Sequence, residues 1–198
     1  VNIDFDTPIL ILKNDNYHGI IDAAHDRLGG LIEELTTSDA EIYIHNPPQV
    51  LYDYLKSQRN RDIIELDILT QEYTINKNSS EFAKNMQAIS EHIIGQENAI
   101  NEISKSLWYL TNVNRSKPYV IMLYGNSSLG KTELVREIAN KFFDGKFYEK
   151  HLSMFKNNNY SDYFFGDAPN RKSLGYDLLE RESNLIFFDE LDKCPEHF

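Results

Sequence analysis

The stretch that decides the fold is Gly125-Asn126-Ser127-Ser128-Leu129-Gly130-Lys131-Thr132. It fits the pattern G-x-x-x-x-G-K-[ST], in which glycines let the backbone curl until its N–H groups point at phosphate oxygens. Lys131 supplies a positive charge for the β- and γ-phosphates, and the Thr132 hydroxyl can coordinate Mg²⁺. We interpret all eight residues as an ATP-binding loop. The alternative is a glycine-rich turn with an exposed lysine.

The sequence on both sides of this loop supports the interpretation. Tyr119–Tyr124 is a nearly continuous apolar run, which predicts a strand buried on both faces of a parallel sheet. Residues 131–143 carry apolar side chains at helical spacing, and the positive end of that helix would face the phosphates. The order strand, loop, helix is the setting that a phosphate-binding loop needs.

A second acidic motif lies further along the chain. The apolar residues 185–188 predict another strand buried on both faces, and Asp189 and Glu190 follow it directly. An acid at such a strand end can hold Mg²⁺ beside Thr132, while the next carboxylate can polarise an attacking water. The alternative is a pair of solvated acids at the end of a strand.

The first part of the chain has a different organisation. A strand at Pro8–Leu12, a helix over 18–35, a strand at Glu41–His45, a helix after Pro48 and strand-like residues 62–75 predict a small βαβα domain. Helices are also predicted from Glu81 and over 96–110. We therefore expect an α/β protein with a small domain at residues 1–76, a linker at 77–90 and a nucleotide-binding domain at 91–198.

Composition excludes several classes of protein. Lys and Arg number 20 against 31 Asp and Glu, and a net charge of −11 argues against a broad nucleic-acid surface. No apolar run reaches the roughly 18 residues that cross a membrane. The single cysteine, Cys194, allows no internal disulfide, so we expect a cytoplasmic protein.

Three motifs together resemble the Clp-type AAA+ ATPases. Ile93-Ile94-Gly95-Gln96-Glu97-Asn98-Ala99-Ile100 is similar to the segment I-G-Q-x-x-A-[IV] that opens those modules. The loop continues Gly-Lys-Thr-Glu-Leu-Val-Arg-Glu-Ile-Ala, and the acidic strand continues Phe-Phe-Asp-Glu-Leu-Asp-Lys, both close to the family's patterns. The resemblance covers about residues 91–198 and does not reach residues 1–80.

The resemblance implies further site residues and partners. His92, Ile93 and Ile94 would line an adenine pocket, although Ile93 and Ile94 fit the protein core equally well. Glu190 and Lys131 would be catalytic, and Thr132 and Asp189 would hold Mg²⁺. The family also implies a ring of identical subunits that acts on a protein partner. The net charge and the lack of a long apolar run predict that neither nucleic acid nor a membrane is a partner.

The sequence departs from the family in two respects. Disaggregase-type modules grip polypeptide with a Gly-aromatic-Val-Gly tetrapeptide, which residues 165–176 lack. Torsin-like relatives of the Clp lineage lack it too. Phe165 and Tyr176 are the aromatic residues that this stretch offers instead. The family's sensor residue, arginine finger and helical lid would follow Phe198, so we expect a piece of a longer chain that hydrolyses ATP slowly.

Two functions therefore stay open at this point. The first is an ATPase that changes the shape of a protein partner, and the second is a nucleotide-responsive assembly module with little hydrolysis of its own. A DNA-directed function is disfavoured by the charge and by the Clp-like motifs.

Three other candidate sites are weaker. His18 and His25, with Asp22 and Asp26, have metal-ligand spacing but fit a solvent-facing helix better. The turn at residues 15–19 follows a strand and is more typical of a capped turn than of a ligand site. Cys194 has no histidine in a recognisable catalytic pattern.

Overall fold

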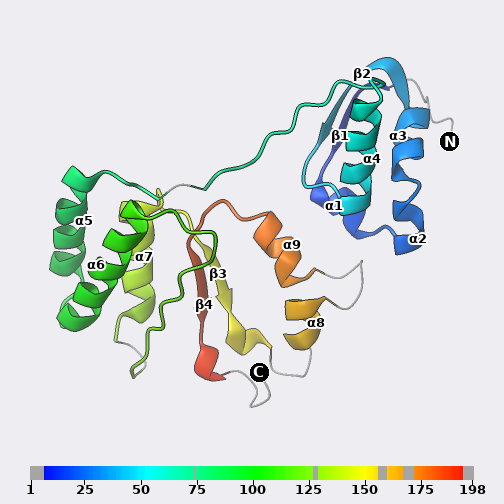
Figure 1. Ribbon diagram of the computed structural model, residues 1–198. Coiled ribbons are helices and arrows are strands. Elements are labelled where there is room, and N and C mark those ends of the chain that lie inside the picture. The colour runs from blue at the N-terminus through cyan, green and yellow to red at the C-terminus, as the bar shows by residue number, and fades with distance from the viewer. Residues whose placement is uncertain (1–6, 74, 127–128, 156–159, 167–171, 194–198) are drawn as a thin grey trace. The chain divides into compact units, whose positions relative to one another are not determined.

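The computed structural model describes residues 7–73, 75–126, 129–155, 160–166 and 172–193. The chain divides into two compact units, which are treated separately below (Figure 1). The first comprises Val1–Gln71 with Asn157–Glu180, and the second comprises Glu72–Lys156 with Arg181–Phe198. Each unit combines helices with one pair of parallel strands, so the predicted α/β class is confirmed. The division into domains at residue 76 stays a prediction.

The first unit is built on two parallel strands. β1 (Thr7–Leu12) pairs with β2 (Thr36–Ile44), and the last pair in the register is Leu12 opposite Ile44. The connection between the strands runs through helices, as parallel pairing requires. The helices described in this unit are α1 (Asn14–His18), α2 (Asp22–His25), α3 (Leu28–Leu35), α4 (Gln49–Asn60), α8 (Tyr160–Phe165) and α9 (Leu174–Leu179).

One apolar cluster holds β1, β2 and helices α1, α3 and α4 of this unit together. Leu51 of α4 is 1% exposed and lies at its centre. The other buried members are Tyr17, Leu28 and Ile32, and partly buried residues of both strands pack against them. Gly29 lets α3 approach α4, because a Cβ at that position would lie 2.4 Å from the ring of Tyr54. Gly29 is therefore inside a helix for a packing reason, whereas a Cβ at Gly30 would meet no atom within 4 Å.

Two predictions for the N-terminal region are wrong in detail. The single helix expected over 18–35 is three helices, interrupted at residues 19–21 and 26–27 rather than at Gly29-Gly30. The strands expected over 62–75 are absent from the described residues of that stretch, where Leu69 is 95% exposed. An apolar run forms a strand only where a neighbouring strand takes up its backbone hydrogen bonds, and the structure gives this one no such neighbour.

The second unit contains three helices packed on one another. They are α5 (Ser79–His92), α6 (Glu97–Asn112) and α7 (Lys131–Phe142), close to the predicted bounds. Asn78 caps α5 by accepting a hydrogen bond from the Ser80 backbone N–H at 3.1 Å. The apolar stripes of the helices meet in a core of Phe82, Met86, Ile89, Ile93, Ile100, Ile103, Leu107, Leu134, Ile138, Phe142 and Phe143.

The strands of the second unit lie side by side near its C-terminal end. β3 (Tyr148–His151) pairs in parallel with β4 (Ile186–Asp189), from Tyr148 opposite Ile186 to His151 opposite Asp189. Each strand is followed by a short 3₁₀ turn, Leu152–Met154 after β3 and Leu191–Lys193 after β4. The register therefore brings the carboxyl ends of both strands to the same edge.

The prediction of a buried strand at Tyr119–Tyr124 is wrong for this structure. The segment belongs to no strand ladder among the described residues, and Val120 and Tyr124 are 84% and 91% exposed. Strand β4, the second strand predicted to be buried on both faces, is also less buried than expected. Ile186 and Phe188 each keep 37% of their surface exposed. In the described residues β4 has a neighbouring strand on one edge only, so it lacks the surroundings of a central strand in a larger parallel sheet.

None of the helices described here is long and apolar enough to span a membrane.

Candidate functional site

The predicted phosphate-binding loop has the backbone conformation that its glycines were expected to allow. Gly130 has φ +78° and directly precedes α7, and Gly125 has φ +147° at the start of the loop. Residues with a Cβ rarely adopt these values. Asn126, Leu129 and Gly130 are described, whereas Ser127 and Ser128 lie outside the described residues.

Lys131 is the first residue of α7, and its side chain folds back over the loop. Its Nζ donates hydrogen bonds to the carbonyl oxygens of Gly125 and Asn126, each at 2.8 Å. The ammonium group is therefore held at the mouth of the loop, at the positive end of the helix. Helix N-termini and lysine side chains both favour phosphate oxygens at such a place.

Thr132 and Asp189 meet although they lie far apart in the sequence. The Thr132 hydroxyl donates a hydrogen bond to Asp189 Oδ2 at 3.2 Å, and Asp189 Oδ1 accepts one from the Glu190 backbone N–H at 2.8 Å. Both side chains are partly buried. A hydroxyl and a carboxylate oxygen at this separation are the donors that Mg²⁺ prefers, so the residues present fit the predicted cation.

Glu190 is held at both of its carboxylate oxygens. The Ser153 hydroxyl donates to Oε2 and the Lys193 ammonium donates to Oε1. These contacts, that of Lys193 first and that of Ser153 second, lower the pKa of the Glu190 carboxyl below its ordinary value. The backbone of Glu190 has φ +58°, a left-handed conformation that is unusual outside glycine and is common at functional sites.

Sequence analysis missed both partners of Glu190. Lys193 lies three residues after it, in the next turn of the chain, so the spacing alone offered a signal. Ser153 comes from the turn after β3, and its position depends on the pairing of β3 with β4. No local pattern in the sequence gives that pairing.

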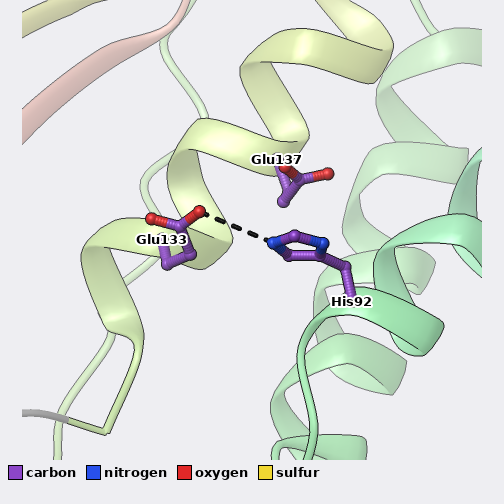
Figure 2. Close-up of side chains that lie close together, drawn as sticks. All are labelled: His92, Glu133 and Glu137. Carbon is purple, nitrogen blue, oxygen red and sulfur yellow. Dashed lines mark ion pairs between the residues drawn. The ribbon is translucent and has the colours of Figure 1, made fainter.

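His92 lies beside the first turns of α7, as Figure 2 shows. Its Nε2 is 3.7 Å from Glu133 Oε1, and Glu137 lies one helical turn further along. The ligand atoms of the three residues lie within 4.8 Å of one another, but the side chains of His92 and Glu133 are 59% and 48% exposed. Ion pairs with this exposure contribute little to stability.

The three residues expected at the adenine pocket point to different places. Ile93 is buried in the core of the three helices, Ile94 is 86% exposed, and His92 faces α7. Ile93 packs in the core, as the alternative interpretation expects, whereas Ile94 does not. The adenine pocket stays a prediction for all three residues.

The weaker candidate sites gain no support from the described residues. The side chains of His18 and Asp22, and all of Cys194, lie outside them, and the Nε2 of His25 is buried without a hydrogen-bond partner in the structure. In the 165–176 stretch, residues 167–171 are not described and Phe165 is 87% exposed. Tyr176 donates its hydroxyl hydrogen bond to Asp15, which is part of helix α1 rather than of a turn.

Comparisons with known proteins found a family and several relatives to which part of this chain is similar. Residues 121–197 match the family model described as "ATPase family associated with various cellular activities (AAA)". A curated relative named "Mitochondrial disaggregase" from Bos taurus is 30% identical over 125 residues, which cover 54% of this chain and 18% of the relative. The relative of the same name from Homo sapiens is also 30% identical, over 54% of this chain and 17% of its own length.

The chain thus spans only 18% of the length of the first of these relatives. No solved structure matches it.

Proposed function

We propose that the protein binds ATP with Mg²⁺ and couples its hydrolysis to the remodelling of a protein partner, because residues 121–197 match the AAA family of ATPases. The protein partner is suggested by relatives that are named disaggregases. The observation that supports the proposal best is the 3.2 Å contact between Thr132 and Asp189, which joins the phosphate loop to the acidic strand end.

Each residue of the site has a separate role in this proposal. The loop N–H groups and Lys131 would bind the phosphates, and Thr132 with Asp189 would hold Mg²⁺, which would neutralise charge on the phosphate oxygens. Glu190 orients the attacking water and accepts its proton, as a carboxylate beside a γ-phosphate can do. Bound Mg²⁺ would supply positive charge at the phosphate oxygens, and the residues of the chain would position the phosphates and the attacking water.

Three further properties belong to the proposal rather than to the findings. We propose that the chain works in an assembly of identical subunits, that it uses neither nucleic acid nor membrane, and that it resides in the cytoplasm. The first follows from the AAA family, and the other two follow from the charge of −11 and the single cysteine.

A second candidate function is favoured by the contacts of Glu190. A carboxylate that Lys193 and Ser153 both engage, with a lowered pKa, is a weaker base than a free one. A protein in that state binds nucleotide and changes its assembly without rapid turnover. The two candidates differ in hydrolysis and not in binding.

The first experiment is calorimetric titration of MgATP into the wild-type chain and into Lys131→Ala. Loss of a charge-assisted contact of roughly 1.5–3 kcal/mol weakens binding by about 10- to 100-fold. Lys141→Ala is the matched control, because that lysine lies in the last turn of the same helix. The control is expected to bind as the wild type does.

The outcomes separate the possibilities clearly. No binding by the wild-type chain, or equal binding by Lys131→Ala, contradicts the proposed site. Where binding is found, the rate of phosphate release decides between the ATPase and the assembly module. Glu190→Gln should then retain MgATP while losing whatever turnover the wild type has.

A further inference from the structure

His151 ends β3 directly opposite the proposed magnesium ligand. Its Cα is paired with that of Asp189 in the β3–β4 register, and its Nδ1 lies 3.6 Å from Asp189 Oδ2. The same oxygen accepts the hydrogen bond of Thr132. His151 and Thr132 therefore approach one carboxylate oxygen from two different elements.

The other side of the His151 ring faces a second carboxylate. Its Nε2 lies 3.6 Å from Glu149 Oε1, which belongs to the same face of β3. That oxygen is buried and accepts no hydrogen bond in the described part of the chain. Arg136 approaches it at 3.9 Å, a distance of electrostatic attraction rather than of hydrogen bonding.

These contacts form a closed circuit around the site. Arg136 lies one helical turn after Thr132 on α7, so the circuit runs from α7 to Glu149 and His151 of β3, to Asp189 of β4 and back to α7. The ligand atoms of the histidine and the two carboxylates lie within 4.8 Å of one another. Two carboxylates this close repel each other, and the ring between them offers nitrogen atoms to both.

We propose that His151 is a positioning residue that holds the Asp189 carboxylate in the orientation in which it faces Mg²⁺. The inference rests on the proposed function and names a residue that neither the motifs nor the comparisons assign. Partners of this kind, which orient a metal ligand without binding the metal themselves, change metal affinity by about 10- to 100-fold when they are removed. Ordinary surface ion pairs do not have this effect.

The role of His151 predicts a defect that depends on Mg²⁺. Without divalent cation, ATP is held by the loop and by Lys131, so His151→Ala should bind ATP as the wild type does. With increasing Mg²⁺, the wild type should gain affinity, and His151→Ala should need about tenfold more Mg²⁺ for the same gain. A merely structural residue would weaken both kinds of binding.

The experiment measures ATP binding by calorimetry in EDTA and across a series of Mg²⁺ concentrations. His151→Gln is the conservative variant, since its amide keeps an N–H that can donate to Asp189, and it should recover part of the Mg²⁺ response. Lys150→Gln is the matched control, because that residue lies on the opposite face of the same strand. It should leave the Mg²⁺ response unchanged.

Three outcomes would overturn the inference. An unchanged Mg²⁺ response in His151→Ala contradicts the inference about His151 and leaves the proposed function standing. An equal loss of affinity with and without Mg²⁺ has the same meaning. An equal loss in Lys150→Gln would show that the strand as a whole, and not His151, sets the response. Failure of the wild type to bind MgATP would instead overturn the proposed function and this inference with it.

Discussion

The two pairs of parallel strands share a topology and differ in the residues at which they end. The last register pair of β1 and β2 is Leu12 with Ile44, and both side chains pack against the core of the first unit. The last pair of β3 and β4 is His151 with Asp189, two polar residues whose side chains lie 3.6 Å apart and which we assign to the proposed magnesium site. Carboxyl ends of parallel strands form ligand sites only where polar groups meet there.

The difference suggests a division of labour along the chain. At the carboxyl ends of its strands the first unit has apolar residues, whereas the second unit has the proposed magnesium ligand there. We therefore expect the strand ends of the first unit to contribute to stability. The second unit has a small two-stranded sheet and a core formed mainly by helices. The predictions below test whether stability and binding separate in this way.

The largest effect is expected from removing core volume in the first unit. Leu51 is 1% exposed, and Leu51→Ala should destabilise this unit by about 3 kcal/mol because it leaves a cavity. Hydrogen exchange of peptides from residues 7–60, measured in the intact chain, reports this loss. MgATP affinity should be unaffected.

The matched variant in the second unit is Leu134→Ala. Leu134 is 2% exposed and lies on α7, so its loss should cost a similar free energy. It should also weaken MgATP binding, because α7 begins with Lys131 and directly follows the proposed phosphate loop. If Leu51→Ala weakens nucleotide binding as much as Leu134→Ala, the two strand pairs do not have separate roles.

A smaller effect is expected at Tyr17, whose hydroxyl is buried and has no hydrogen-bond partner among the residues that the structure describes. Burial raises the pKa of Tyr17 to about 12. Since an unfolded tyrosine ionises near pH 10, the folded state binds the proton more tightly, and stability should fall as the pH rises from about 10 towards 12. Tyr17→Phe removes both the unpaired hydroxyl and this dependence.

Tyr17→Phe should therefore be more stable than the wild type by about 1 kcal/mol at neutral pH, and by more in alkaline solution. Chemical denaturation at pH 8 and pH 11 measures the two differences. A variant that is less stable at both values would show that the hydroxyl has a partner, such as a water molecule.

The smallest effect concerns the pH dependence of turnover. Lys193 is the first cause of the lowered pKa of Glu190, so Lys193→Met should move that pKa up towards its ordinary value. A base with a higher pKa becomes protonated sooner as the pH falls, and the acidic limb of the hydrolysis profile should shift to higher pH. Lys146→Met, which removes a lysine paired with Glu182 at 3.0 Å, is the control and should not shift it.

Sequence analysis predicted the features that rest on local pattern. The bounds of α5, α6 and α7 follow from apolar spacing and capping, and the loop at residues 125–132 follows from its glycines and its lysine. Two of the wrong predictions concern strands, which form only when a segment far away in the sequence pairs with them. Residues 62–75 and 119–124 have the composition of strands, but a strand forms only beside another strand.

The same distinction explains the site. Thr132, Asp189 and Glu190 belong to motifs and were predicted, and the structure brings Thr132 and Asp189 together. His151 and Ser153 stand in no motif, and they reach the site only because β3 pairs with β4 in one particular register. A shift of that register by one residue would turn His151 to the opposite face.

The exposed segment Tyr119–Tyr124 has a consequence for the handling of the protein. Six successive residues with high β-propensity, without charge or proline, have the composition of segments that seed cross-β aggregation. Lys117 and Pro118 directly precede them, and residues of these kinds oppose the growth of such assemblies from one end. At the other end, the segment runs straight into Gly125, where the phosphate loop begins, so fibre formation and nucleotide binding would compete for the same stretch of backbone.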